Sequence, residues 1–391
     1  MEAAVCRDLA PEFIRSVSIP YEVLKSSCLR TVDKRIYYEG ECLRKPVSEI
    51  FKMHAERYHM LRDKTILVTG GTGSFGKRFT GEVLSKFKPR KVIIYSRDEY
   101  KQHIMQKQFA KYSDRLRFFL GDVRDRYRLY RAFEGVDYVV HAAALKQVPA
   151  LEYNPTEAVQ TNVMGADNIV NAAIDRGVKH VIALSTDKAV NPINLYGATK
   201  LVAEKIFIAA NAYSGGKVKF SAVRYGNVIG SRGSVIPFFL ELKEKGITEF
   251  PITDKNMTRF WITLDQAVAL VVRAIAQSGG EEIFVPVIPS MKITDLAKAI
   301  EPNCTFKFIG VRPGEKLHES LISRDESRNV RVFDGIYVIM PQFSAFEDSK
   351  VEKKYDKYPS VEEGFVFQSD TNERWLSREE LGEMIRGMKI E

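Results

Sequence analysis

The chain has 391 residues, of which 45% are hydrophobic and 28% are charged, and its formal net charge is +9 at pH 7. This length and composition are ordinary for a soluble globular protein with more than one structural part. Lys and Arg are dispersed among 50 acidic residues. The basic charge therefore favours a small anionic ligand and excludes nucleic acid as the expected partner.

The cysteines and the apolar runs indicate the cellular compartment of the protein. Cys6, Cys28, Cys42 and Cys304 fit neither a metal-ligand spacing nor a disulfide framework, so they indicate free thiols in a reducing compartment. The N-terminus MEAAVCRDLAPEF lacks the features of a secretory signal, and apolar runs such as AVALVV at 267–272 are too short to span a bilayer. We expect a cytoplasmic protein with no metal site and no membrane association.

Residues 1–62 form an N-terminal extension that differs from the rest of the chain. They hold three of the four cysteines, carry interleaved charge and show only short amphipathic stretches. No catalytic motif appears in them. A small appended domain and an oligomerisation arm are both compatible with this pattern, and its role stays open.

From Lys64 onward, short apolar strands alternate with helices. The strand-like runs are KTILVTG, KVIIYS, LRFFLGD, VDYVVHAA, HVIALST and KFSAVRYGNV. This alternation predicts an α/β fold, a Rossmann-type doubly wound parallel sheet over residues 63–230 with helices on both faces. The pattern then becomes irregular, which predicts a smaller substrate-binding lobe over 231–391, with 260–280 returning to the main domain.

A glycine-rich turn, VTGGTGSFG, follows the first strand and opens a helix. Glycines at this spacing let the backbone turn sharply and approach a pyrophosphate, while the N-terminus of the helix faces the anion. The turn predicts dinucleotide binding. The residues that we assign to this contact are Gly70, Thr72, Gly73, Ser74, Phe75 and Gly76.

The end of the second strand, IIYSRDEYK, indicates which dinucleotide binds. Ser96, Arg97 and Lys101 suit the 2′-phosphate of NADP, because a guanidinium binds phosphate with forked donors. Asp98 leaves NAD open, since a carboxylate there can bind the ribose hydroxyl. Asp122 follows the third strand, where it either reaches the adenine or caps the next helix. We favour NADP.

The segment STDKAVNPINLYGATK at 185–200 places Tyr196 and Lys200 four residues apart, on one face of a helix. An ammonium beside a phenol lowers the pKa of the phenol, which can then transfer a proton near neutral pH. Asp187 and Lys188 stand at the carboxyl end of the preceding strand. They are either an acid and a base for chemistry beyond oxidation or a solvated ion pair.

Together the motifs TGGTGSFG, GDVRD, HAAALK, TDK, YGATK and RYGNV resemble an extended short-chain dehydrogenase/reductase. MTRFW, RPGEK and the run around YGATK are similar to the inverting UDP-N-acetylglucosamine 4,6-dehydratases, which begin pseudaminic acid synthesis. The resemblance covers residues 60–391 and leaves 1–59 outside it. It implies UDP-N-acetylglucosamine as substrate, a tightly bound NADP that is regenerated in each turnover, and a homo-oligomer.

The same resemblance implies a role for each residue of the centre. Tyr196 accepts the proton of the C4 hydroxyl as hydride moves to NADP⁺, with Thr186 nearby. Lys188 removes the C5 proton, and Asp187 protonates the departing C6 hydroxyl before hydride returns to C6. Because Lys188 must be neutral to act as a base, we expect nearby Lys200 and the nicotinamide to lower its pKa.

Further contacts are also implied by the resemblance. For the RPGEK segment, the alternative to binding the substrate is an ordinary structural role as a turn that caps a helix. The added cofactor-binding residues are Val123, Ala142, Lys146 and Val228, with Tyr196 and Lys200. The substrate-binding residues are Lys146, Asn227, Arg232, Val235, Arg259, Arg312 and Glu315.

Two other functions use parts of the same pattern. A UDP-sugar 4-epimerase shares the glycine turn, Tyr196 and Lys200, but it needs no Asp-Lys pair after Thr186. A non-catalytic NADP sensor typically loses the Tyr or the Lys, and this chain keeps both. The complete set favours the dehydratase.

Overall fold

The computed structural model describes residues 60–231, 233–342 and 350–386, together with the backbone of three short strands before them. The chain divides into two compact units, Met1–Met60 and Leu61–Glu391. In the first unit, β1 (Leu29–Val32), β2 (Arg35–Tyr38) and β3 (Glu41–Cys42) form an antiparallel sheet. Residues 60–62 of the predicted extension are also described, and the rest of it lies outside the described residues.

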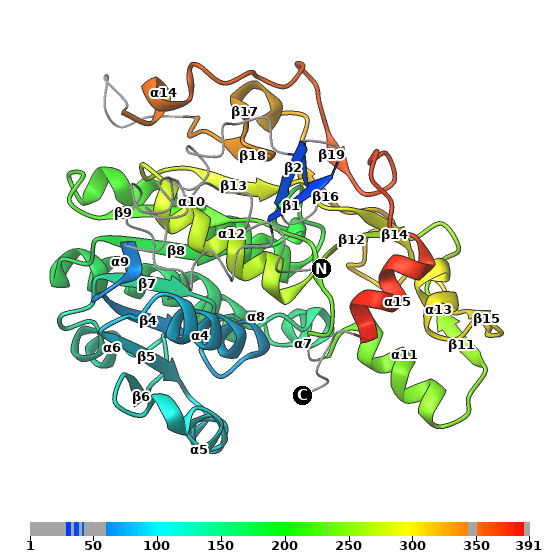
Figure 1. Ribbon diagram of the computed structural model, residues 1–391, viewed down its shortest axis with the longest axis horizontal. Coiled ribbons are helices and arrows are strands. Elements are labelled where there is room, and N and C mark those ends of the chain that lie inside the picture. Colours follow the sequence, from blue (N-terminus) through cyan, green and yellow to red (C-terminus); the bar gives the residue numbers. More distant parts are fainter. Residues whose placement is uncertain are drawn as a thin grey trace. The chain divides into compact units, whose positions relative to one another are not determined.

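The second unit is built on a nine-stranded sheet with the order β17-β18-β13-β9-β8-β7-β4-β5-β6 (Figure 1). From β6 to β13 all neighbours are parallel, and β18 and β17 continue the sheet in antiparallel pairing. The strands are β4 (Thr65–Thr69), β5 (Lys91–Ser96), β6 (Leu116–Leu120), β7 (Tyr138–His141), β8 (His180–Leu184), β9 (Lys219–Val223), β13 (Ile283–Pro286), β17 (Val330–Phe333) and β18 (Ile336–Ile339). The reversal of strand order at β4 is that of a dinucleotide-binding fold, which confirms the predicted fold class.

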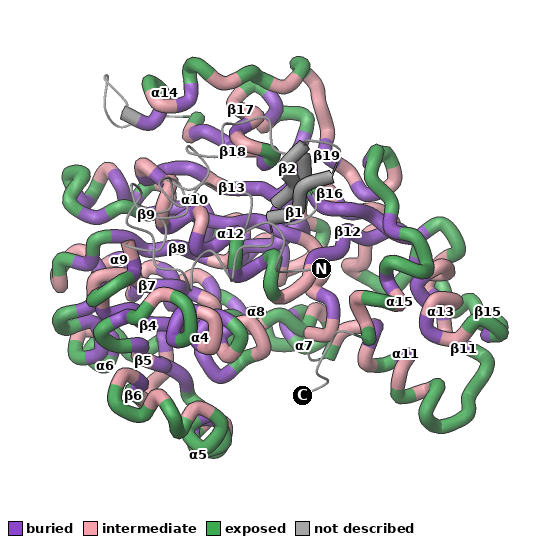
Figure 2. Tube along the Cα trace, in the orientation of Figure 1, coloured by how far each residue is buried: buried purple, intermediate pink, exposed green. Residues whose placement is uncertain are grey.

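Helices cover both faces of this sheet, because its strands have apolar side chains on both faces. All five residues of β4 are buried, and a parallel strand with two covered faces reads as a continuous apolar run. One layer contains α4 (Ser74–Lys86) packed against α12 (Leu264–Gln277), and another contains α6 (Arg126–Ala132), α9 (Gly165–Arg176) and α10 (Leu195–Tyr213). The strands are largely buried and the outer sides of the helices are exposed (Figure 2).

The connections between these elements carry shorter helices. α5 (Glu99–Gln108) follows β5, and α7 (Val148–Tyr153) and α8 (Pro155–Ala158) precede α9. The predicted strand KFSAVRYGNV is divided by a bend: β9 ends at Val223, and β10 (Asn227–Val228) pairs with a different sheet. No helix in the described part of the chain is both long and apolar enough to cross a membrane.

The C-terminal part builds a smaller core beside the sheet. It contains three small sheets. In the first, β12 (Thr258–Ile262) lies between β10 and β14 (Ser290–Lys292); the others pair β11 (Glu249–Ile252) with β15 (Thr305–Phe308) and β16 (Ser320–Ile322) with β19 (Phe367–Gln368). Its helices are α11 (Val235–Glu244), α13 (Ile293–Ile300), α14 (Lys350–Tyr355) and α15 (Arg378–Arg386). Phe239, Phe250 and Trp261 are buried in this core.

Candidate active site

The glycine-rich turn joins β4 to α4 and fits a dinucleotide phosphate. Gly70 has φ +64°, and a Cβ there would lie 2.8 Å from the backbone nitrogen of Ala143. Only glycine tolerates both conditions. Gly73 is the N-cap of α4 and gives that helix no side-chain cap, so the first amides of α4 remain suited to an anion. Ala142 continues the strand beside this turn, where its N–H donates to the carbonyl of Thr69.

The other predicted residues of the turn are buried, or they belong to the first turn of α4. Thr72 and Gly76 are buried, Ser74 is the first residue of α4, and Phe75 stacks on Phe79 at 5.8 Å between ring centroids. The turn is therefore anchored to the core by its second half.

The end of β5 carries the residues expected to choose between NADP and NAD. Ser96 is buried, and its hydroxyl accepts a hydrogen bond from Gln102 Nε2 at 3.0 Å. Arg97 is half exposed, and its Nη1 lies 3.3 Å from Asp122 Oδ2. Arg97, at the end of β5, therefore pairs with the carboxylate that follows β6, the third strand.

Asp98 has a local role. Its carboxylate is the N-cap of α5, where it accepts from the backbone N–H of Lys101, and it also pairs with the Lys101 ammonium at 2.6 Å. These bonds to Lys101 lower the pKa of Asp98. Asp98 and Lys101 are therefore bonded to each other, and neither side chain is left free to bind the ribose.

The third strand leads to GDVRD, where Asp122 is held by a neighbour. Arg124 donates to Asp122 Oδ2 from Nε at 3.0 Å and from Nη2 at 2.8 Å. Burial alone would raise the pKa of Asp122, but the bonds from Arg124 and the charge of Arg97 lower it. The N-cap of α6 is Asp125 and not Asp122. Val123, predicted to contact the cofactor, has its side chain buried in the core.

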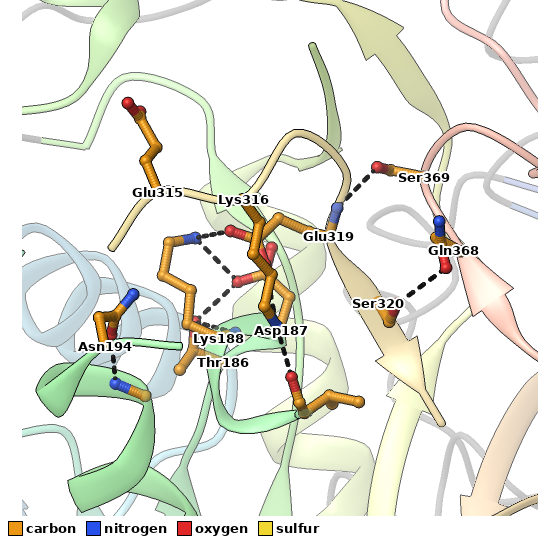
Figure 3. A network of polar contacts seen from close by, with 12 residues as sticks. Thr186, Asp187, Lys188, Asn194, Glu315, Lys316, Glu319, Ser320, Gln368 and Ser369 are labelled. Carbon is orange, nitrogen blue, oxygen red and sulfur yellow. Dashed lines mark hydrogen bonds and ion pairs between the residues drawn. The ribbon is translucent and has the colours of Figure 1, made fainter. Parts of the chain in front are cut away.

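Three of the predicted catalytic residues, Thr186, Asp187 and Lys188, lie together in the segment that joins β8 to α10 (Figure 3). Thr186 is the N-cap of a short 3-10 turn, Asp187–Ala189, and its hydroxyl donates to Asp187 Oδ1 at 2.9 Å. Tyr196 belongs to the first turn of α10, which approaches the 3-10 turn closely: a Cβ on Gly197 would lie 2.1 Å from the Lys188 carbonyl oxygen. Glycine after the Tyr therefore brings the phenol to the Asp-Lys pair.

Lys188 lies between two carboxylates. Its Nζ is 3.0 Å from Asp187 Oδ1 and 3.3 Å from Glu319 Oε1, and both carboxylates are buried. Although burial opposes the charge, Asp187 and Glu319 outweigh it and raise the pKa of Lys188. The expectation that the pKa of Lys188 is lowered was wrong, because the adjacent Asp187 and, after it, Glu319 stabilise the ammonium; sequence reasoning missed Glu319 and did not weigh the charge of Asp187.

The pKa of Tyr196 also differs from the expectation. Burial raises it, while the nearest lowering charge is Lys188 and a hydrogen bond with Thr186 acts in the same direction. Lys200 instead donates from Nζ to the Leu184 carbonyl at 2.7 Å, and burial lowers its own pKa to about 8. Lys200 thus ties α10 to the end of β8, while the charge of Lys188 acts to lower the pKa of Tyr196.

The RPGEK segment forms a turn that lies on the start of α10. The N–H of Glu315 donates to the Arg312 carbonyl at 3.0 Å, and Asn194 Nδ2 donates to the Gly314 carbonyl at 2.7 Å. Asn194 also caps α10 by accepting from the Gly197 N–H. The turn-and-cap alternative thus describes real contacts, and these contacts bring the segment to the helix that carries Tyr196.

Arg259 holds the same segment from β12. Its guanidinium donates to the carbonyls of Thr258 at 2.7 Å, Lys316 at 2.9 Å and Leu317 at 3.0 Å, and lies 3.8 Å from Glu315 Oε1. Arg259 is almost fully buried. It is therefore committed to the loop that carries Glu319.

The other predicted substrate contacts lie on several elements. Asn227 and Val228 form β10, and Asn227 Oδ1 is buried with no hydrogen-bond partner in the described part of the chain. Val235 begins α11, and Arg312 is exposed. Desolvation lowers the pKa of Lys146, and the charge of nearby Lys188 lowers it further. Arg232 lies outside the described residues, within which no cluster of three or more metal-ligating side chains occurs.

A parallel sheet that reverses at a glycine-rich turn, with a Tyr and a Lys one helical turn apart beyond β8, defines an extended short-chain dehydrogenase/reductase. Comparison with known proteins narrows this class. The chain belongs to the polysaccharide biosynthesis protein family, which matches residues 66–341.

Individual relatives agree with this membership. The chain is 51% identical over 330 residues to an inverting UDP-N-acetylglucosamine 4,6-dehydratase from Campylobacter jejuni, covering 83% of this chain and 98% of the relative. It is 45% identical over 292 residues to a UDP-glucose 4-epimerase from Rickettsia prowazekii, covering 72% and 84%. The resemblance predicted from the motifs is confirmed.

Solved structures show the same fold. The X-ray structure of Pen from Bacillus thuringiensis matches with a TM-score of 0.75 and 37% identity, covering 83% of this chain and 98% of that one. A dTDP-glucose 4,6-dehydratase from Streptomyces venezuelae matches with a TM-score of 0.61 and 23% identity, covering 74% and 95%.

Proposed function

We propose that the protein is an NADP-dependent, C5-inverting UDP-N-acetylglucosamine 4,6-dehydratase, which forms a UDP-4-keto-6-deoxy-N-acetylhexosamine. The observation that carries this proposal is the ion pair of the buried Asp187 carboxylate with the partly exposed Lys188 ammonium, beside Tyr196. An oxidation and reduction at C4 alone needs only a phenol and a hydride carrier, whereas loss of water across C5 and C6 needs an additional base and acid. The name of the 51% identical relative supports the same reaction.

The residues divide the proton transfers among them. A bound nicotinamide dinucleotide supplies the hydride acceptor for C4 and the hydride donor for C6. Tyr196 takes the proton of the C4 hydroxyl, with Thr186 positioned by its bond to Asp187. The C4 ketone makes the C5 hydrogen acidic, so Lys188 can remove it, while Asp187 protonates the departing C6 hydroxyl.

The cofactor site favours NADP over NAD. Arg97 has a half-exposed guanidinium at the strand end where a 2′-phosphate is recognised in such folds. Asp98, which would suit NAD, caps α5 and pairs with Lys101. The glycine turn and the uncapped start of α4 bind the pyrophosphate of either dinucleotide.

The remaining parts of the proposal concern the setting of this reaction. We assign the UDP part of the substrate to the lobe formed by residues 231–391, through Asn227 at its entrance and Arg312 and Glu315 on the RPGEK turn. The protein acts in the cytoplasm as a homo-oligomer, and its product enters pseudaminic acid synthesis for protein glycosylation.

The second candidate is a UDP-sugar 4-epimerase, which the name of the 45% identical Rickettsia relative favours. One incubation separates the two. Purified protein is given UDP-N-acetylglucosamine in D₂O without added cofactor, and the product is analysed by mass spectrometry and NMR. We expect loss of one water, a 4-keto group, deuterium at C5 and ring couplings of the inverted sugar. An unchanged mass with the C4 epimer would instead establish the epimerase.

A further inference from the structure

Glu319 is a buried acid that the proposed reaction scheme does not use. It is 2% exposed, stands just before β16, and its backbone N–H donates to Ser369 Oγ at 3.0 Å. Its carboxylate faces two ammonium groups, Lys188 at 3.3 Å and Lys316 at 3.8 Å. Among the described residues, Glu319 Oε2 is nevertheless buried without a hydrogen-bond partner.

Lys188 needs such an acceptor. Held between Asp187 and Glu319, it rests as an ammonium, and an ammonium cannot remove the C5 proton. Both carboxylates have one buried oxygen, Asp187 Oδ2 and Glu319 Oε2, that has no hydrogen-bond partner among the described residues. They differ at the other oxygen: Asp187 Oδ1 accepts hydrogen bonds from Thr186 and Lys188, whereas Glu319 Oε1 has the longer contact with Lys188, at 3.3 Å (Figure 3). The proposed function also requires Asp187 as the acid for the C6 hydroxyl, so Glu319 is the better acceptor.

We propose that Glu319 receives the proton that Lys188 must lose before it acts as the C5 base, which makes Glu319 a positioning residue that acts through Lys188. This inference rests on the proposed function. One N–H bond of the ammonium breaks and one O–H bond forms on Glu319, so an ion pair becomes two neutral groups and no other reactant takes part. When the C5 proton reaches the amine, the ammonium is restored.

The inference predicts how the rate of the C5 step depends on pH. With an internal acceptor, formation of the amine does not depend on solvent hydroxide, and the C5 step should vary little with pH through neutrality. Without it, Lys188 must lose its proton to solvent, and the rate should rise about tenfold per pH unit until Lys188 is neutral. The titratable and charged groups that act on Lys188 are Lys146, Asp187, Tyr196, Arg259, Lys316 and Glu319.

The test compares Glu319→Gln with the wild type by C5 deuterium exchange in D₂O between about pH 6 and pH 9. We expect Glu319→Gln to be about 10²-fold slower at neutral pH and to recover as the pH rises. Glu319→Asp, which keeps an acceptor, should retain the shape of the wild-type profile. Glu282→Gln is the matched control, because Glu282 is also buried and paired with a lysine, Lys354, but lies in a different cluster.

A second readout needs no substrate or cofactor. The side chain of Lys188 is 25% exposed, so its reaction with acetic anhydride across pH, read by mass spectrometry, reports its pKa. Loss of the Glu319 carboxylate should move this titration to lower pH, and Glu282→Gln should not. A Glu319→Gln profile parallel to the wild type, or an unmoved Lys188 titration, overturns the inference. Absence of C5 exchange in the wild type overturns the proposed function itself, and this inference with it.

Discussion

The ammonium of Lys200 lies 2.7 Å from the carbonyl oxygen of Leu184, the last residue of β8. This bond fixes the helix that carries Tyr196 to the strand that leads into Thr186. Lys200 is 5% exposed, and its burial lowers its pKa to about 8, although Glu204 acts in the opposite direction. Burial therefore disfavours the charged form of the lysine that makes this link.

The first prediction concerns alkaline stability. The pKa of Lys200 is about 8 in the folded state against the ordinary value of 10.5, so between these values the unfolded chain binds more protons and folding is favoured as pH rises. Relative to Lys200→Met, the wild type should gain up to about 3 kcal/mol from pH 8 to pH 10.5. Urea unfolding of both proteins at several pH values measures this. A difference that is constant with pH would contradict it.

The second prediction concerns Gly197. A Cβ on this residue would lie 2.1 Å from the Lys188 carbonyl oxygen, so Gly197→Ala must separate the start of α10 from the Asp-Lys turn. We expect a loss of about 1–3 kcal/mol in the free energy of unfolding and at least a tenfold loss of activity.

Gly81→Ala is its matched control. Gly81 is also helical, but a Cβ there would meet the Phe109 ring at an ordinary 3.4 Å. This variant should be more stable by about 0.5–1 kcal/mol, with activity unchanged. If Gly197→Ala behaved in the same way, the close approach would have no functional consequence.

The features predicted from the sequence were those whose signals are local. The apolar run of β4, the glycines of the turn, and the spacing of Tyr196 and Lys200 each lie within one short segment, where periodicity and backbone demands are readable. Asp98 as a cap was also readable, because an Asp directly before a helical segment is a common N-cap.

What could not be predicted depends on distant segments. Glu319 comes from the C-terminal part and has no spacing relative to Lys188, yet it adds to the effect of Asp187 in raising the pKa of Lys188. The commitment of Arg259 to the carbonyls of Lys316 and Leu317 has the same origin. Both follow only from how the RPGEK segment docks against α10.

The third prediction concerns cofactor choice. Arg97→Ala should weaken binding of NADP by at least tenfold and leave that of NAD nearly unchanged, because only the 2′-phosphate needs the guanidinium. Asp98→Ala should lower the midpoint of thermal unfolding, since α5 loses its cap, and leave the preference unchanged. Titration of each purified variant with both dinucleotides measures this. A shift from NAD to NADP in Asp98→Ala would show that Asp98 reads the ribose.

The last prediction concerns Arg259. Its guanidinium spans three carbonyls, two of which belong to Lys316 and Leu317, just before Glu319. A lysine offers one compact ammonium and cannot reproduce this planar set of donors, so Arg259→Lys should cost about 1–3 kcal/mol of stability by leaving buried carbonyls unpaired. It should also loosen Glu319 from Lys188 and shift the pH profile of C5 exchange towards that of Glu319→Gln.

The matched control for that variant is Arg378→Lys, which changes an arginine paired with Asp295 on the surface, where the arginine side chain is 50% exposed. Exposed ion pairs contribute little, so its stability and pH profile should match the wild type. Urea unfolding and C5 exchange, measured side by side, separate two roles for Arg259. If Arg259→Lys raises KM but keeps the wild-type stability and pH profile, Arg259 acts on the substrate directly. If stability and profile change together, Arg259 acts by holding the loop that carries Glu319.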